Sequence, residues 1–173
     1  MKRQCITAFG SSRLPQDDPR FDDVMRLGER LGRAGWDALT GGHQGMMAAI
    51  CRGVRSGGGH VRGVTLERFP TPPDNHLNEE VRARNFFERM GMLIEQTDAY
   101  LVLPGGLGTL AELAMSWDLL AIGVLEPRPL IFYGDTWMSF IDSLKESLIL
   151  SVDHAFDLIH HCHTPDEVLA ALA

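Results

Sequence analysis

The chain has 173 residues, which is enough for one domain with a full hydrophobic core. Its formal net charge is −7, and 45% of its residues are hydrophobic and 23% charged. These values are ordinary for a soluble globular protein, and they argue against a nucleic acid or an anionic membrane surface as the partner. A small anionic ligand can still bind to backbone N–H groups beside a local arginine.

The cysteines and the apolar runs indicate the compartment. Cys5, Cys51 and Cys162 are odd in number and widely spaced, unlike a disulfide framework. The apolar run near the start is too short for a signal peptide, and the longest one, over residues 119–125, is too short to span a bilayer. We therefore expect a cytoplasmic protein without a membrane segment.

Short apolar runs alternate with helical stretches along the whole chain, without a repeat or a linker. In chain order, the patterns predict a strand over 4–9, a helix over 20–34, a strand over 36–40, a helix over 46–55, a strand over 60–66, a loop over 69–73, a helix over 78–96, a strand over 99–103, a helix over 109–124, a strand over 129–133, a helix over 137–150, a strand over 158–162 and a last helix that starts at the cap Thr164. Such alternation is typical of a parallel sheet with helices on both faces. The expected fold is one Rossmann-like α/β domain over residues 1–173, a three-layer sandwich with a mostly parallel sheet.

The predicted helix over 109–124 is apolar on nearly all sides. One face of a sheet cannot cover that much apolar surface, so a second layer must bury the rest. We expect a second copy of the chain to do so and the protein to be a homodimer. The alternative is that Trp137, Phe140 and Ile141 of the next helix cover the surface within one chain.

Three predicted strands end in turns that are rich in Gly and Ser. The carboxyl ends of parallel strands share one edge of a sheet, and ligands bind there where the strand order reverses. Glycine lets the backbone approach a phosphate, and a helix N-terminus directs N–H groups and a positive dipole end at it. At each single turn, tight reversal and close helix packing are the alternative use of glycine. The residues predicted to bind a phosphate monoester are Gly10, Ser11 and Ser12 after the first strand, Gly41, Gly42 and Gly45 after the second, and Pro104, Gly105, Gly106, Gly108 and Thr109 after the fourth.

A dinucleotide-binding pattern overlaps the last of these turns. Gly106, Gly108 and Ala111 fit the dinucleotide fingerprint, and Asp135 follows the next strand where a ribose-binding acid is expected. That fingerprint usually belongs to the first strand of its fold, and the chain has no room for a second substrate domain. A nicotinamide dehydrogenase is therefore not favoured, and no cofactor is expected.

The segment from Pro104 to Glu112, PGGLGTLAE, closely resembles the PGGxGTxxE motif of the Lonely-guy (LOG) family, the cytokinin riboside 5′-monophosphate phosphoribohydrolases. Residues 40–47 and 9–12 resemble that family's other two turns, in the same order and spacing. The resemblance implies a Rossmann-like fold, a homodimer, and hydrolysis of a nucleoside 5′-monophosphate, AMP or a cytokinin-like nucleotide, to a free base and ribose 5-phosphate.

Some positions depart from the family pattern. Family members usually carry an Arg-Lys pair before the fourth strand, and here the matching residues are Arg84 and Asn85. In the main motif, Leu107 stands where the family often has a tyrosine, and Ala111 stands where it has the first of two glutamates. These changes leave the phosphate cradle intact and bear on base preference and on catalysis. A non-catalytic carrier of a nucleotide or a phosphate-bearing cofactor is therefore the alternative function.

Two residues are the candidates for catalysis. Cleavage of an N-glycosidic bond builds positive charge on the ribose, so Glu112 is expected to bind the ribose hydroxyls, stabilise that charge and align water. Arg84 is expected across the ribose. Each has a structural alternative: Thr109 and Glu112 have the spacing of a capping box, and Arg84 can pair with Glu88 on a helix surface.

Proteins of this kind are often labelled lysine decarboxylases. A pyridoxal-phosphate decarboxylase needs a lysine for its Schiff base, and the only lysines, Lys2 and Lys145, are not beside the glycine turns. This chemistry is therefore not expected.

The remaining candidates carry no predicted function. Residues 160–163 read His-His-Cys-His, but alternate residues of a strand face opposite ways, so the four do not converge and no metal site is expected. His43 either contacts the ligand or faces water. Core or dimer contacts are expected of four apolar side chains: Met46, Met47, Phe86 and Phe87.

Overall fold

The computed structural model describes residues 3–70, 75–149 and 152–173. Its seven strands form one sheet in the order β4-β3-β2-β1-β5-β6-β7, and every neighbouring pair is parallel. The strands are β1 (Gln4–Phe9), β2 (Trp36–Thr40), β3 (Val61–Leu66), β4 (Glu79–Ala83), β5 (Ala99–Val102), β6 (Leu130–Tyr133) and β7 (Ile159–Cys162). The strand order reverses at β1, which is the point where a ligand crevice is expected in such a sheet.

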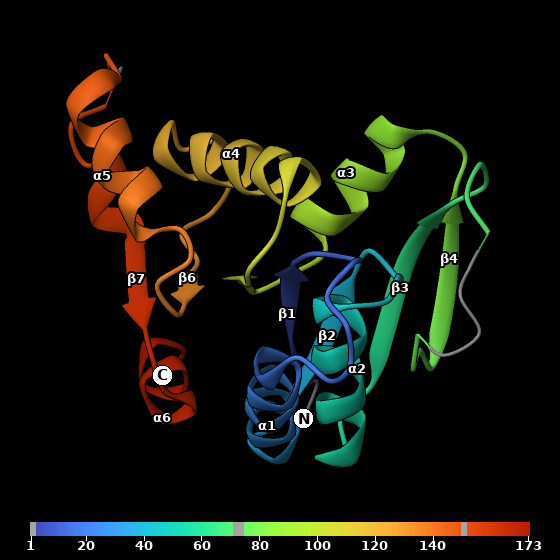
Figure 1. Ribbon diagram of the computed structural model, residues 1–173. Helices are drawn as coiled ribbons and strands as arrows, with labels where there is room; N and C mark the ends of the chain where they lie inside the picture. Colours follow the sequence, from blue (N-terminus) through green and yellow to red (C-terminus); the bar gives the residue numbers. More distant parts are fainter. Residues whose placement is uncertain (1–2, 71–74, 150–151) are drawn as a thin grey trace.

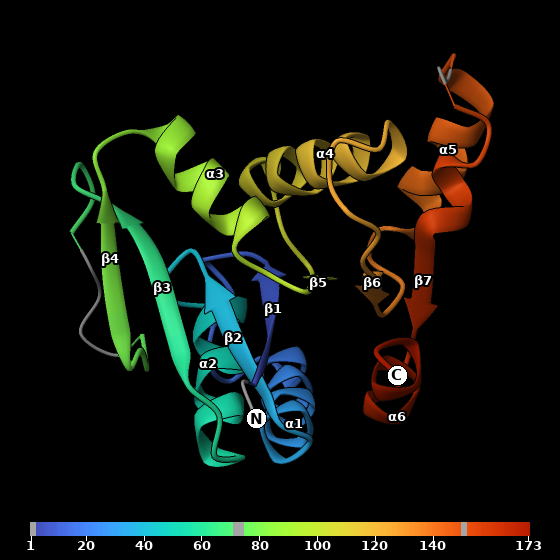
Figure 2. The same ribbon diagram turned by 180° about the vertical axis from the view of Figure 1, so that it is seen from behind.

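Helices cover both faces of the sheet (Figures 1 and 2). Helices α1, α2 and α6 lie on one face, and α3, α4 and α5 lie on the other. The helices are α1 (Pro19–Arg33), α2 (Met46–Ser56), α3 (Phe86–Glu95), α4 (Leu107–Ala121), α5 (Met138–Ser147) and α6 (Pro165–Ala171), with a short 3₁₀ helix η1 (Ala155–Leu158). The predicted three-layer, Rossmann-like α/β fold is confirmed.

The central strands are buried on both faces, so the protein has an apolar core on each side of the sheet. All residues of β5 and of β6 are buried. Side chains of β1 pack into both cores: Ile6 lies on the side of α1 and α2, and Phe9 lies on the side of α3 and α4. A strand that is covered on both faces reads as a continuous apolar run, and this is why these strands stand out in the sequence.

The predicted helix over 78–96 is wrong in its first half. Residues Glu79–Ala83 form β4, which pairs with β3 alone at the edge of the sheet, with Val81 opposite Val64. The helix α3 begins only at Phe86, where the Asn85 side chain accepts a hydrogen bond from the Glu88 N–H at 3.0 Å. The strand that the sequence places fourth is therefore β5.

Smaller details at the helix ends are also settled. The capping box of the last helix is confirmed, since Thr164 and Glu167 exchange side-chain and backbone hydrogen bonds. Helix α4 begins two residues earlier than predicted, at Leu107. Residues 71–73 of the predicted loop, residue 150 of the predicted helix, and Lys2 lie outside the described residues.

None of the three cysteines is joined in a disulfide, as expected, and Cys51 and Cys162 are buried. No helix in the described part of the chain combines the length and the apolar character that crossing a bilayer requires.

Candidate functional site

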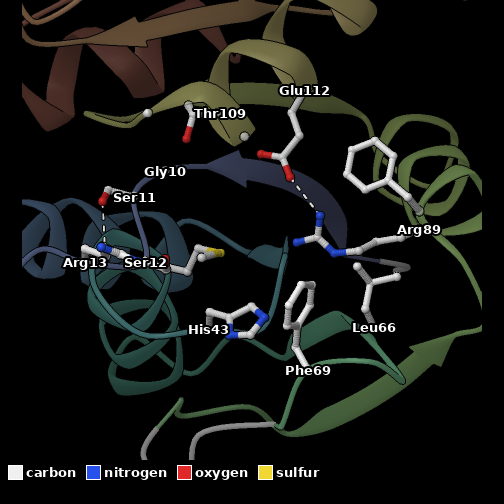
Figure 3. A pocket seen from close by; sticks show the side chains of 14 residues that line it. Gly10, Ser11, Ser12, Arg13, His43, Leu66, Phe69, Arg89, Thr109 and Glu112 are labelled. Carbon is white, nitrogen blue, oxygen red and sulfur yellow. Dashed lines mark hydrogen bonds and ion pairs between the residues drawn. The ribbon is translucent and has the colours of Figure 1, made fainter.

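A cavity of about 570 Å³ opens where β1, β2, β3 and β5 end (Figure 3). It lies next to the reversal of strand order at β1. Its walls come from the loops after these strands and from the helices α2, α3 and α4. The lining residues are Gly10, Ser11, Ser12, Arg13, His43, Met47, Leu66, Phe69, Phe86, Arg89, Gly106, Gly108, Thr109 and Glu112.

The three glycine-rich turns are tied together by backbone hydrogen bonds. The Ser11 N–H donates to the Pro104 carbonyl at 2.9 Å, and the Met46 N–H donates to the Ser11 carbonyl at 2.8 Å. Gly45 permits the second contact: its φ is +66°, and a Cβ there would lie 2.3 Å from the Ser11 carbonyl oxygen. The loop after β1 is thus held between the other two turns.

The start of α4 is an open N-terminus on the cavity. Its cap residue, Gly106, makes no side-chain capping bond, and the first N–H groups of a helix have no partner within the helix. A Cβ at Gly106 or at Gly108 would meet no atom within 4 Å. These two glycines therefore leave space in front of free N–H groups and a positive dipole end, which is the arrangement that binds an anion.

Glu112 and Arg89 form a buried ion pair one helical turn behind this N-terminus. Arg89 Nη1 lies 3.1 Å from Glu112 Oε1, and the two side chains are 10% and 11% exposed. Arg89 Nε also donates to the Val64 carbonyl at 2.8 Å, which fixes the guanidinium. Burial raises the pKa of the Glu112 carboxyl, and the positive charge of Arg89 partly offsets this shift.

Gly41 makes room for this ion pair. A Cβ at Gly41 would lie 2.0 Å from Arg89 Nη2. Gly105 has a similar effect beside α4, since a Cβ there would lie 2.1 Å from Thr109 Oγ1. These glycines, which the sequence suggests as ligand contacts, act behind the cavity wall by making space for the side chains that line it.

The capping-box alternative for Glu112 does not hold in the structure. The cap of α4 is Gly106, so Thr109 is the third residue of the helix rather than its cap. Figure 3 shows the Glu112 carboxylate turned toward the Arg89 guanidinium, with His43 and Phe69 on the opposite side of the cavity. The Glu112 side chain therefore lines the cavity, where a ligand can contact it.

The structure does not bring Arg84 to the cavity. Its side chain is 78% exposed, and its Nε lies 3.1 Å from Glu88 Oε2, which is the surface pair named above as the alternative. Arg89, which sequence reasoning missed, is the arginine that meets Glu112. A signal for it was present: Arg89 falls three residues after Phe86 and four before Leu93, on the apolar stripe of the helix.

The predicted binding residues divide into two groups. Gly41, Gly42, Gly45, Pro104 and Gly105 do not line the cavity. The other six do, together with the catalytic candidate Glu112, and these six are Gly10, Ser11, Ser12, Gly106, Gly108 and Thr109.

The cavity also has an apolar part and a histidine, His43. Leu66, Phe69 and Phe86 line the apolar part, and Phe86 is 45% exposed, so of the two expected roles a core contact is wrong and a dimer contact stays a prediction. Met47, by contrast, is buried, as expected. Burial, and secondly the charge of Arg89, lower the pKa of His43, which favours a neutral imidazole.

The departures from the family pattern lie outside the cavity. Asn85 caps α3, and the Leu107 side chain is 85% exposed. Ala111 is exposed on α4. None of these three residues is among those that line the cavity.

Comparisons with known proteins agree with the family resemblance. The family model described as possible lysine decarboxylase matches residues 47–172. The probable cytokinin riboside 5′-monophosphate phosphoribohydrolase LOGL5 of Oryza sativa subsp. japonica is 35% identical over 129 residues, which cover 69% of this chain and 51% of the relative. The cytokinin riboside 5′-monophosphate phosphoribohydrolase of Mycobacterium tuberculosis is 30% identical over 134 residues, which cover 73% and 70%. The chain thus spans about half the length of the rice relative and more of the mycobacterial one.

Solved structures share the fold at lower identity. The molybdenum cofactor binding protein from the phototrophic bacterium Rippkaea orientalis superposes with a TM-score of 0.77 over 98% of this chain and 95% of that chain, at 17% identity. That likeness concerns the fold alone, whereas the sequence matches define the relationship. The chain belongs to the Lonely-guy (LOG) family, whose family model carries the description possible lysine decarboxylase.

Proposed function

We propose that the protein hydrolyses the N-glycosidic bond of a nucleoside 5′-monophosphate, releasing the free base and ribose 5-phosphate. One observation carries this proposal: an uncapped helix N-terminus and a buried Glu–Arg pair line the same cavity, one helical turn apart. The names of the relatives support the same reaction class.

The phosphate is proposed to sit at the start of α4. There the N–H groups of the residues after Gly106 lie close to the loop after β1, which contains Ser11 and Ser12. The ribose then lies beside Glu112. The base extends toward the apolar wall formed by Leu66, Phe69 and Phe86, where the neutral His43 can exchange a hydrogen bond with it.

The chemistry follows from the charge that the reaction creates. As the bond from C1′ to the base nitrogen breaks, its electron pair leaves with the base and positive charge grows on the ribose. The Glu112 carboxylate stabilises that charge and orients water, whose oxygen bonds to C1′ while its proton is released and the base takes one up. Arg89 keeps Glu112 ionised and fixed, so we assign to Arg89 the role that the sequence suggested for Arg84.

Lysine decarboxylation does not fit the residues of this cavity. A pyridoxal-phosphate enzyme of that kind requires a lysine to bind the cofactor covalently. In the described part of the chain, no lysine lines the cavity, and Lys145 is an exposed residue of α5 that lies 3.3 Å from Asp142. We derive no step through that cofactor.

The direct test is product analysis. The purified protein is incubated with AMP and a series of other nucleoside monophosphates, and free base and ribose 5-phosphate are separated by chromatography. We expect base release from at least one monophosphate and much slower release from the matching nucleoside, which lacks the phosphate. Tight binding of the monophosphate without release would instead favour the carrier alternative.

A pair of glycine substitutions tests the phosphate position. Gly108→Ala adds a methyl group in open space at the helix start, so we expect unchanged or slightly higher stability and a KM for AMP raised about tenfold, or ~1.4 kcal/mol. Urea unfolding and steady-state kinetics measure both. The matched variant Gly105→Ala forces a contact with Thr109 and should lose stability instead. An unchanged KM in Gly108→Ala would contradict the proposed phosphate position.

We also propose that the protein is a homodimer that pairs through α4 and α5. The within-chain alternative is partly realised: Trp137 and Ile141 are buried, but Phe140 is 36% exposed, and an apolar groove of about 360 Å³ remains between the two helices. Further large apolar side chains are exposed on α4 and just after it. They are Leu107, Met115, Ile122 and Val124.

A charged side chain in that groove should separate the subunits. Ala114→Glu places a second carboxylate beside Asp118, four residues on, among the apolar side chains of the groove, and light scattering after size exclusion is expected to show monomers at concentrations where the unmodified protein is dimeric. Arg52→Glu on α2, on the other face of the sheet, is the control and should leave the mass unchanged. A monomeric unmodified protein would refute the dimer.

Two further expectations stay proposals. The three thiols, none of them in a disulfide, are compatible with a cytoplasmic location. The net charge of −7 supports a small nucleotide rather than a nucleic acid as the ligand.

A further inference from the structure

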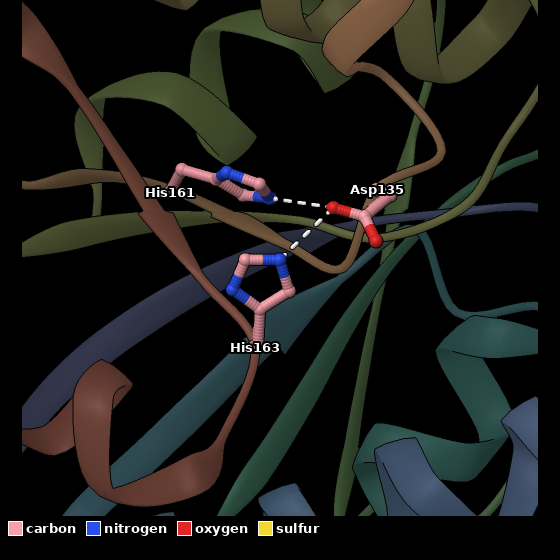
Figure 4. A group of neighbouring side chains, drawn as sticks. All are labelled: Asp135, His161 and His163. Atoms are coloured by element: carbon pink, nitrogen blue, oxygen red, sulfur yellow. Dashed lines mark hydrogen bonds and ion pairs between the residues drawn. The ribbon is translucent and has the colours of Figure 1, made fainter.

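A second group of ligand-bearing side chains lies where β6 and β7 end (Figure 4). Asp135 follows β6, and His161 and His163 lie at the end of β7. Asp135 Oδ1 is 2.9 Å from His163 Nε2 and 3.3 Å from His161 Nε2. One ligand atom from each residue falls within 4.8 Å of the other two.

This convergence differs from the expectation for residues 160–163. His161 and His163 are two residues apart and therefore share one face of the strand, while the third donor comes from the neighbouring strand. His160 lines a different hollow, beside α4 and η1, and Cys162 is buried in the core. The rule of alternation excludes a site made of all four residues, but not one made of two of them with Asp135.

Hydrogen bonds anchor the backbone on both sides of the cluster. The Gly134 N–H donates to the Cys162 carbonyl at 2.9 Å, which continues the pairing of β6 with β7 and fixes Asp135 beside the histidines. On the other side, the His163 N–H donates to Glu167 Oε2 at 2.6 Å. The sheet and α6 therefore set the backbone positions from which the three side chains converge.

The distances suit a small ion. A tetrahedral ion with bonds of about 2.1 Å holds its ligand atoms about 3.4 Å apart. The two Nε2–Oδ1 distances of 2.9 and 3.3 Å lie close to this value, so an ion needs only small side-chain shifts to enter between these atoms. It would replace the His163–Asp135 hydrogen bond and the hydrogen bond of 3.1 Å between His161 Nε2 and the Gly134 carbonyl oxygen. Glu167 Oε2 lies 3.9 Å from His163 Nδ1, so a carboxylate stands near the other nitrogen of that ring.

We propose that Asp135, His161 and His163 bind a divalent transition-metal ion of the zinc class. Two imidazole nitrogens and one carboxylate suit Zn²⁺, Co²⁺, Ni²⁺ or Cu²⁺, whereas Ca²⁺ and Mg²⁺ prefer oxygen ligands alone. Asp135 is 77% exposed, which leaves a side of the ion open for water or an added ligand. The ion would cross-link the loop after β6 to the end of β7, the edge strand of the sheet.

The test uses the full chain without a histidine tag, stripped of metal with a chelator. Titration calorimetry with Zn²⁺ should show one ion bound per chain. Co²⁺ bound in its place should give the strong visible absorption of a tetrahedral site. Asp135→Asn, His161→Gln and His163→Gln should each weaken Zn²⁺ binding by at least about tenfold. His160→Gln, which removes a histidine of the same strand outside the cluster, should bind as the unmodified chain does.

Thermal unfolding provides an independent readout. Zn²⁺ should raise the Tm of the unmodified chain and of His160→Gln, and should do so much less in the three cluster variants. Circular dichroism checks that the variants fold, which is expected because Asp135 and His163 are exposed. Unchanged Zn²⁺ affinity in His161→Gln and His163→Gln, or no stoichiometric binding to the unmodified chain, would overturn the proposal.

Discussion

Replacing Glu112 with Gln should lower kcat/KM for AMP by about 10²- to 10³-fold while the fold is retained. The amide has nearly the same shape, and its oxygen can still accept a hydrogen bond from Arg89 Nη1, which lies 3.1 Å from the carboxylate in the unmodified protein. What disappears is the negative charge beside the ribose. Chromatographic assay of free base, with urea unfolding as the check on folding, measures the two effects separately.

The pH profile adds a readout that a structural role for Glu112 would not produce. Catalysis requires the ionised carboxylate, so activity falls as the pH drops through the pKa of Glu112. Because burial raises that pKa, the loss should occur at a higher pH than for an exposed glutamate, and it should be absent in Glu112→Gln. Glu88→Gln, which breaks an arginine–carboxylate pair on the surface, is the control. Near-normal turnover in Glu112→Gln would refute the catalytic role.

Replacing Arg89 with Ala should have the largest effect on stability. It leaves the Glu112 carboxylate buried without its counter-ion, which typically costs about 3–5 kcal/mol of unfolding free energy. Both side chains are only about one-tenth exposed, so solvent does not screen the loss. Arg84→Ala removes a surface pair and should change stability by less than about 0.5 kcal/mol. Urea unfolding at neutral pH compares the two variants.

The pH dependence of this loss identifies its cause. Without Arg89, the folded-state pKa of Glu112 rises further above its unfolded value, so the penalty is full where the carboxylate is ionised and shrinks as the pH falls toward the unfolded pKa. The double variant Arg89→Met with Glu112→Leu should recover most of the stability and remain inactive, because it buries no charge. If Arg89→Ala unfolds at the same urea concentration as the unmodified protein, the buried pair does not contribute as we describe.

The fold was largely predictable because most of its strands are buried on both faces. The apolar runs of β1, β2, β5 and β6 stand out from the polar turns that bound them. The edge strand β4 was missed because Glu79, Glu80 and Arg82 are exposed and are good helix formers. Its conformation is imposed by pairing with β3, which no local pattern contains.

The arginine expected in the site was chosen from the family resemblance and not from the helix pattern. The resemblance matched Arg84 and Asn85 to the family's Arg-Lys pair, whereas Asn85 is the cap of α3 and Arg84 pairs with Glu88 on the surface. The partner of Glu112 lies 23 residues before it, so only the packing of α3 against α4 identifies Arg89. The cluster of Asp135 with His161 and His163 is hidden for a similar reason, since it spans two strands.

Gly41 has a consequence for the position of the Arg89 guanidinium. A methyl group at this position would overlap the Arg89 guanidinium, so a residue larger than glycine at position 41 would push the guanidinium away from its present place beside Glu112. The glycine at the end of one strand thus sets the position of a cation on a neighbouring helix.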